Sequence, residues 1–182
     1  ALCYLLVNRP AKKNALSEAM WAAIPAALTE LDADTRVRVI VLTSSTDGSF
    51  SAGADIAELE TIAADPIRQE SNRTAIRNAQ RALARTEKPT IAQIGGACMG
   101  GGCGLALHCD MRFAAETARF GITPAKLGIV YPLNDTKQLM DLVGPAHTKS
   151  MLFTGRVMAA EEALSIGLVD EIHDASDLAE KT

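Results

Sequence analysis

The 182-residue sequence is poor in aromatic residues, cysteine and net charge, and it contains no long apolar run. The four cysteines lack the C-x2-C spacing and the histidine partners of a zinc site, so we expect free thiols, no disulfide and no metal; they are Cys3, Cys98, Cys103 and Cys109. A net charge of −4 without a basic stripe argues against nucleic acid as a partner. No apolar run approaches the ~20 residues of a membrane span, and no secretion signal opens the chain, so we expect a cytoplasmic protein without a membrane partner.

The sequence does contain a regular succession of strand-like and helix-like segments. Apolar residues make up 48% and charged residues 22%, the balance of a soluble globular protein, and the length suits a single domain over 1–182. The expected strands are 2–8, 37–44, 88–96 and 168–174. The expected helices are 18–34, 66–85, 136–144, 146–155 and 159–167, and another helix is expected to begin at Ile56. Loops are expected over 46–55 and 122–135. Ser17 and either Asn134 or Asp135 are expected to cap helices, and Pro25 predicts a kink. This alternation predicts an α/β fold.

A cluster of glycines lies in the stretch Met99–Gly104, directly after the strand expected at 88–96. Glycine loses more backbone entropy on folding than any other residue, so such a cluster usually marks a close approach of the main chain to something else. A Walker loop is excluded because Gly100 is followed by Gly101 rather than by lysine. The dinucleotide pattern also fails, because the third glycine is absent after Gly102 and Gly104.

The glycines could instead serve an anionic oxygen. A helix beginning near Gly102 would leave its first N–H groups unpaired at its positive end. The stretch "FSAGAD" offers further N–H groups around Gly53 and Ala54. Two such donors that converge on one oxygen would form an oxyanion hole, in which each donor typically lowers a reaction barrier by about 3 kcal/mol. The alternative is a tight strand-to-helix packing site without a ligand.

Five stretches of the sequence resemble, in order and spacing, the crotonase or enoyl-CoA hydratase/isomerase superfamily. They are "NRPAKKNAL", "FSAGADIAEL", "GGACMGGGCGLALHCD", "ARFGITPAKLGIVY" and "EEALSIGLVDEI". The resemblance implies a crotonase-like ββα spiral core, an acyl-CoA thioester as substrate and a homotrimer or a dimer of trimers. It also implies that much of the C-terminal helical part of such proteins is missing from these 182 residues. No separate cofactor is expected, since coenzyme A arrives as part of the substrate.

The same resemblance implies roles for individual residues. The backbone N–H groups of Ala54 and Gly101 would form the oxyanion hole for the thioester carbonyl. Lys12, Lys13 and Ala15 would lie near the phosphate or ribose of coenzyme A. Other residues implied to line the substrate site are Ala52, Asp55, Ile56, Gly100, Gly104 and Pro124.

The positions of the two hydratase glutamates of the superfamily correspond to Gly104 and Pro124, which have no titratable group. The stretch "TPAKLGIVY" instead is similar to the corresponding loop of methylmalonyl-CoA decarboxylases, although those enzymes commonly carry histidine at the position of Ala54. Decarboxylation of a malonyl-type thioester yields an enolate directly and needs no base. We therefore expect a decarboxylase or C–C lyase in which Tyr131 bonds the departing carboxylate or the thioester and Thr123 assists. Tyr131 could equally be packed with its hydroxyl bonded to the backbone.

Two other functions stay open. One is a hydratase or isomerase that uses an unexpected group, such as Glu58 or an anion bound beside Gly104. The other is a non-catalytic protein that binds coenzyme A. Residues expected to be structural or uninvolved are His108, as a buried core residue, and His147, His173, Asp110 and Glu116.

Overall fold

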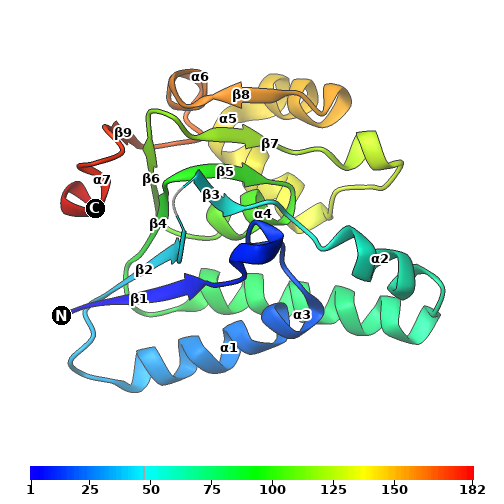
Figure 1. The fold of residues 1–182 in the computed structure, drawn as a ribbon, viewed down its shortest axis with the longest axis horizontal. Coiled ribbons are helices and arrows are strands. Elements are labelled where there is room, and N and C mark those ends of the chain that lie inside the picture. The colour runs from blue at the N-terminus through cyan, green and yellow to red at the C-terminus, as the bar shows by residue number, and fades with distance from the viewer. Residues whose placement is uncertain (47) are drawn as a thin grey trace.

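The computed structural model describes residues 1–46 and 48–182, and these residues form two sheets flanked by helices (Figure 1). The first sheet has five strands that pair in parallel, in the order β1 (Leu2–Val7), β2 (Val39–Ser44), β4 (Thr90–Ile94), β6 (Met111–Ala115) and β9 (Glu171–His173). The second sheet has the order β3 (Gly48–Ser51), β5 (Gly96–Met99), β7 (Arg119–Gly121) and β8 (Val157–Ala159), with β8 antiparallel to β7. The predicted α/β class is therefore confirmed.

The chain alternates between the two sheets as it proceeds. A strand of the first sheet leads to a strand of the second, which leads to a helix, so that β2–β3, β4–β5 and β6–β7 each open one turn of a spiral. The helices that close these turns are α2 (Ile56–Ala63) with α3 (Pro66–Arg85), α4 (Gly101–Leu107) and α5 (Leu133–Thr154). Short 3₁₀ helices lie at η1 (Pro10–Lys12) and η2 (Pro124–Leu127), and α6 (Ala160–Ser165) and α7 (Leu178–Lys181) follow near the C-terminus. This order confirms the predicted ββα spiral.

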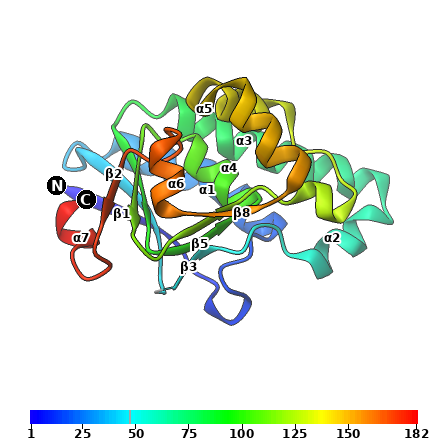
Figure 2. The same cartoon turned by 90° about the horizontal axis from the view of Figure 1, so that it is seen from above.

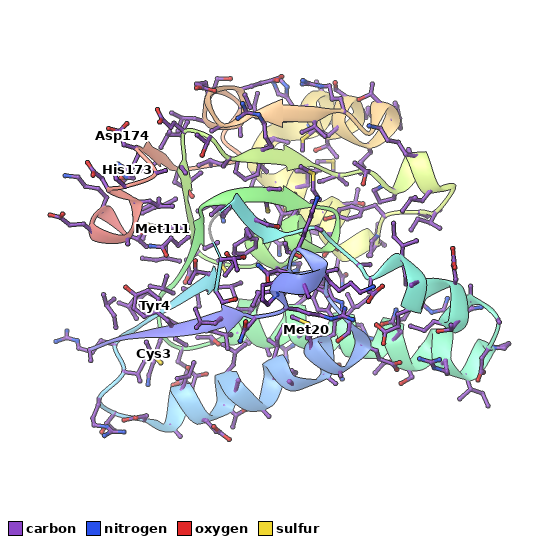
Figure 3. All side chains as sticks on the ribbon, viewed as in Figure 1. Cys3, Tyr4, Met20, Met111, His173 and Asp174 are labelled. Atoms are coloured by element: carbon purple, nitrogen blue, oxygen red, sulfur yellow. The ribbon has the colours of Figure 1, made fainter. Side chains whose placement is uncertain are left out.

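Helices cover the first sheet on one face. The helix α1 (Glu18–Ala33) packs along α3 beneath β1 and β2 (Figure 1). Ser17 caps α1 by accepting a hydrogen bond from the Met20 N–H, as predicted. Side chains alternate along β1, so that Cys3 points toward α1 while Tyr4 points away from it (Figure 3).

Seen from above, α4 lies between the strands of the second sheet and the helices α3 and α5 (Figure 2). This short helix is almost wholly buried, because small and apolar residues follow one another around its surface. Its position makes it the centre of a core to which both sheets contribute side chains, among them Ile40, Ile94 and Phe120. The four cysteines are free, as expected, and three of them lie in this core as small apolar residues.

The structure corrects two of the sequence-based expectations. The loop predicted over 46–55 contains β3, while its residue Asp47 lies outside the described residues. Helix α1 runs from Glu18 to Ala33 with Pro25 inside it, and the kink at Pro25 stays a prediction. Neither Asn134 nor Asp135 caps α5. The helix begins after Pro132, and Asp135 lies inside its first turn with its side chain against α4.

The two helices predicted over 136–144 and 146–155 form one element in which Gly144 (φ 75°, ψ 168°) makes a kink. Among the described residues, no helix is long and apolar enough to cross a membrane. Within the same parts of the chain, no group of three or more metal-ligating side chains is positioned to hold a metal ion.

Candidate active site

The backbone N–H of Ala54 has no hydrogen-bond acceptor among the described residues, because its loop pairs with Leu16 through the two residues that flank Ala54. Leu16 N donates to Gly53 O at 2.7 Å, and Asp55 N donates to Leu16 O at 3.1 Å, so Ala54 sits at the centre of an isolated parallel bridge. In this pattern the flanking residues face Leu16, and the N–H of the central residue points to the other side. Within the described residues, Ala54 N donates no hydrogen bond.

The N–H of Gly101 is free because Gly101 is the first residue of α4. The first helical bond of this turn runs from Gly104 N to Gly100 O at 3.0 Å, so Gly101 N lies outside the helical ladder. Gly100 has φ 47° and ψ −110°, a conformation that only glycine adopts readily, and it turns the next peptide N–H outward. No acceptor for Gly101 N exists in the parts of the chain that the structure describes.

These two N–H groups lie side by side. A Cβ atom added to Gly101 would stand 3.8 Å from Ala54 N, and one added to Gly53 would stand 3.5 Å from Gly101 N. A residue with positive φ precedes each donor, Gly53 (φ 93°) before Ala54 and Gly100 before Gly101. Both donors belong to half-buried residues. The structure brings together the two donors that the sequence predicts.

Close packing between α4 and β3 holds the two loops at this distance. A Cβ atom on Gly102 would lie 2.7 Å from Ser51 Cβ, so only glycine fits there. Ser51 Oγ accepts from Gly53 N at 3.1 Å and donates to Asn14 O at 2.9 Å. Asn14 is fully buried in the left-handed conformation, where its side chain bonds Arg9 N, Thr46 Oγ1 and Ser49 O. Sequence reasoning missed the supporting residues Asn14 and Ser51, because their value depends on contacts between distant segments.

Tyr131 lies beside the same loop. Its hydroxyl donates a long hydrogen bond of 3.4 Å to Gly100 O, the carbonyl of the peptide that carries Gly101 N. Burial raises the pKa of Tyr131 well above its ordinary value, so the hydroxyl stays protonated. Thr123 and Pro124 are half-buried at the start of η2, and Pro124 and Tyr131 line one wall of a cavity of about 430 Å³. Both interpretations of Tyr131, packing and substrate contact, are compatible with this position.

A carboxyl group that sequence reasoning overlooked lies next to Gly104. A Cβ atom on Gly104 would stand 3.0 Å from Asp135 Oδ2 and 3.3 Å from Gln80 Nε2. Asp135 is 2% exposed, and burial raises its pKa, while His108 and the facing Gln80 amide act to lower it. Even so, neither Asp135 Oδ1 nor Gln80 Nε2 makes a regular hydrogen bond among the described residues.

A signal for this group exists in the sequence. Asp135, Leu139 and Val143 follow one another at intervals of four and are all buried, so the aspartate occupies the apolar stripe of α5. His108 is buried, as predicted, and its Nδ1 donates to Gly104 O at 2.7 Å while lying 3.8 Å from Asp135 Oδ1.

The residues expected near coenzyme A fall into two groups. Lys12, Lys13, Ala52 and Ile56 are exposed. Ala15, in contrast, is buried and accepts a long hydrogen bond from Arg9. The Asp55 carboxylate pairs with Arg9 at 2.7 Å and caps α2, and Arg9 lowers its pKa.

An apolar cavity begins beside this loop. Ile56 lies at the N-terminus of α2 and lines a cavity of about 650 Å³ between α2, α3 and the loop that follows η2. The alternative acid/base candidate Glu58 is engaged elsewhere, because its Oε2 accepts from Glu18 N at the start of α1. Asp110 accepts from both Thr90 N and Thr90 Oγ1, which supports the structural role predicted for it.

Comparison with known proteins gives a consistent result. The family model described as enoyl-CoA hydratase/isomerase matches residues 1–182. A crotonyl-CoA hydratase of Syntrophomonas wolfei is 38% identical over 177 residues, which is 97% of this chain and 67% of that protein. A short-chain-enoyl-CoA hydratase of Clostridium acetobutylicum is 36% identical over 172 residues, 94% of this chain and 65% of that protein. The chain thus spans about two thirds of the length of the curated relatives it matches.

Solved structures show the same fold. The crystal structure of an enoyl-CoA hydratase/isomerase family protein from Hyphomonas neptunium superposes with a TM-score of 0.96 at 46% identity, covering 99% of this chain and 69% of that one. An enoyl-CoA hydratase from Bacillus anthracis superposes with a TM-score of 0.93 at 32% identity, with the same coverage.

Proposed function

This chain belongs to the enoyl-CoA hydratase/isomerase family, and we propose that it acts on an acyl-CoA thioester through an enolate stabilised by Ala54 and Gly101. The single observation that carries the proposal is the proximity of two backbone N–H groups that come from separate turns of the spiral and donate no hydrogen bond among the described residues. A thioester oxygen placed between them would receive two hydrogen bonds as its negative charge develops. Each such donor is worth about 3 kcal/mol of barrier, so the pair could supply much of the rate enhancement.

We further propose that the reaction is a malonyl-type decarboxylation or a related C–C cleavage. When the substrate carboxylate leaves as CO2, the electron pair of the broken bond remains on the α-carbon and is delocalised onto the thioester oxygen. This step needs no base. It therefore suits a site in which the positions on α4 and η2 that correspond to the hydratase glutamates hold Gly104 and Pro124, which have no titratable group. The resemblance of the "TPAKLGIVY" loop to methylmalonyl-CoA decarboxylases supports the same reaction, as does the position of the Tyr131 hydroxyl beside Gly100.

The surroundings suit the rest of an acyl-CoA molecule. The cavity beside Ile56 is lined mainly by apolar residues and would accept the acyl group or the pantetheine arm. Lys12 and Lys13 are exposed, and Lys13 O accepts from Ala52 N in the loop that leads to Ala54, so their ammonium groups would reach a phosphate bound there. The Asp55 carboxylate, which pairs with Arg9 and caps α2, would fix the shape of this entrance.

A panel of thioesters tests the proposal. Release of CO2 from methylmalonyl-CoA or ethylmalonyl-CoA supports it. Hydration of crotonyl-CoA without CO2 release would instead favour the hydratase alternative, with which the names of the relatives agree. Tight binding of coenzyme A without turnover of any thioester would indicate a non-catalytic binding protein.

Tyr131→Phe tests the role of the hydroxyl. We expect CO2 release to fall sharply, by about tenfold or more if a hydrogen bond to the charged carboxylate worth about 1.5–3 kcal/mol is lost, with little change in affinity for coenzyme A. The matched control is Tyr4→Phe, because Tyr4 is the other tyrosine of the chain and lies half-exposed on β1. Turnover by Tyr131→Phe at the rate of the control would reject the role.

A further inference from the structure

Asn72 is a buried amide without a partner inside the part of the chain that the structure describes. It lies near the start of α3 and is 8% exposed, and its side chain makes no hydrogen bond among the described residues. Within the same residues, the unbonded side-chain atoms that are completely enclosed belong to Asp32, Gln80 and Asp135. The Asn72 amide is not one of them, and Asn72 lines a cavity. Because buried polar side chains normally have a hydrogen-bond partner, we expect a molecule in this cavity to provide one.

The cavity is the one of about 650 Å³ between α2, α3 and the loop that follows η2. Its wall is mainly apolar, and three of its large apolar residues, Ile56, Leu127 and Ile129, are each about half exposed. Exposed apolar residues that gather around one cavity are typical of a site for an apolar ligand. An apolar chain that filled this cavity would therefore be bounded by these residues and would also meet the Asn72 amide.

The other polar residues of the cavity wall are less suited to contact such a chain. Gln69 Nε2 donates to a backbone carbonyl at 2.8 Å, and Arg73 forms an ion pair at 3.1 Å on the surface. Arg73 and Glu60 are both exposed, so water competes for their side chains. Among the described residues of this wall, Asn72 is thus the polar one that is both buried and unbonded.

The cavity wall continues from both sides of the proposed oxyanion hole. Ile56 follows the donor Ala54 by two residues, and Ile129 precedes Tyr131 by two residues. The Tyr131 hydroxyl bonds Gly100 O, the carbonyl of the peptide that carries the second donor. A thioester whose oxygen lay between the two donors would therefore have this cavity beside its acyl group.

We propose that Asn72 is a specificity-determining residue, which selects acyl groups that carry an uncharged hydroxyl or carbonyl on an otherwise apolar chain. This inference rests on the acyl-CoA function proposed above and names the class of substrate for the same site. In the proposed reaction, the chain is the substituent on the α-carbon of a malonyl-type thioester. The Asn72 amide can both donate and accept, so it can bond a hydroxyl or a carbonyl oxygen. A plain alkyl chain would displace water from the amide and leave it unbonded, which disfavours binding.

The binding of paired acyl-CoA molecules tests this role without depending on turnover. The pairs are butyryl-CoA, hexanoyl-CoA and octanoyl-CoA, each with its terminal hydroxyl derivative, and the measurement is the dissociation constant by titration calorimetry. We expect the wild type to bind at least one hydroxyl derivative about tenfold more tightly than its alkyl partner, a difference of about 1.4 kcal/mol. Asn72→Leu replaces the amide with an apolar side chain of similar size. This preference should therefore vanish or invert in Asn72→Leu.

Two further variants keep the test decisive. Asn78→Leu is the matched control, because Asn78 is an exposed asparagine on the same helix, and it should keep the wild-type preference. In Asn72→Ala the side chain is too short to bond the chain, so the preference should vanish there as well. Equal affinity of the wild type for both members of every pair would overturn the proposal. A wild-type preference that both Asn72 variants retain would also overturn it, and equal weakening of all pairs would place Asn72 at the shared pantetheine arm instead.

This inference and the proposed decarboxylation fail in different ways. A preference that depends on Asn72, without CO2 release from any malonyl-type thioester, would overturn the decarboxylase and leave the role of Asn72 intact. CO2 release by the wild type, together with a preference that is absent or independent of Asn72, would overturn the role of Asn72 alone. Failure of every thioester to bind would overturn both.

Discussion

Gly102 provides the sharpest test of the proposed oxyanion hole, although it contributes neither donor. A Cβ atom at this position would lie 2.7 Å from Ser51 Cβ and 3.1 Å from Ser51 O. Carbon atoms in contact prefer a separation of about 3.5 Å, so Gly102→Ala should push α4 and the end of β3 apart by roughly 0.8 Å. Gly101 N moves with α4, and Ala54 N follows β3, so the two donors should no longer meet at one point.

The expected loss of stability is small compared with the loss of activity. Overpacking of a well-packed core costs about 1–3 kcal/mol, and the higher helix propensity of alanine offsets up to ~1 kcal/mol of it. A donor that no longer reaches the thioester oxygen costs about 3 kcal/mol of barrier, which is a factor of about a hundred or more in turnover. Gly102→Ala should therefore lose up to about 2 kcal/mol of stability and remain folded without urea, while losing most of its activity.

Gly95→Ala is the matched control, because a Cβ atom there meets nothing within 4 Å. The assay compares turnover of the best thioester of the panel with the midpoint of urea unfolding for both variants. Near-wild-type turnover by a folded Gly102→Ala protein would show that the distance between α4 and β3 does not control the reaction. The oxyanion hole at Ala54 and Gly101 would then be refuted.

Two further predictions concern stability. Asn14→Ala removes three side-chain hydrogen bonds from a fully buried residue with positive φ. It should lower the free energy of unfolding by about 2–4 kcal/mol, measured by urea unfolding. A loss below ~1 kcal/mol would contradict this prediction. Asp135→Asn should stabilise the protein more at pH 7.5 than at pH 4.5. The folded-state pKa of Asp135 is raised above its ordinary value of 3.8. The wild type therefore loses stability as pH rises from the ordinary pKa through the raised folded-state pKa, whereas the asparagine variant, which has no carboxyl group at this position, does not. An equal difference at both pH values would contradict the raised pKa.

The sequence predicts the fold well where local signals and packing agree. Ser17 caps α1, β2 is a continuously apolar buried strand, and Gly144 divides α5 near the predicted boundary of two helices. The strand β3 was missed because its four residues, "GSFS", contain little of the β-branched pattern that indicates a strand. Its pairing with β5 depends instead on the close approach of Gly48 and Gly96, which only the folded chain displays.

The candidate site likewise contains residues that the sequence predicts and residues that it misses. Ala54 and Gly101 are predictable from the resemblance, and the structure places their nitrogens close together, while their role as an oxyanion hole stays a prediction. Asp135 is missed because a polar residue near a helix start is more often a cap, whereas here the first turn of α5 faces the core. The acyl group, the reaction subclass and the homotrimer that the resemblance implies stay predictions.

The two proposed donors belong to the main chain, and this has a consequence for how the chemistry can change. Among single substitutions at Ala54 or Gly101, only proline deletes the amide hydrogen itself, so other replacements at these two positions keep the donor group. An acidic side chain, in contrast, is lost with a single substitution. In the proposed reaction, the groups that stabilise the enolate therefore belong to the main chain, whereas any group that transfers a proton must belong to a side chain, so substitutions can alter the second while leaving the first in place.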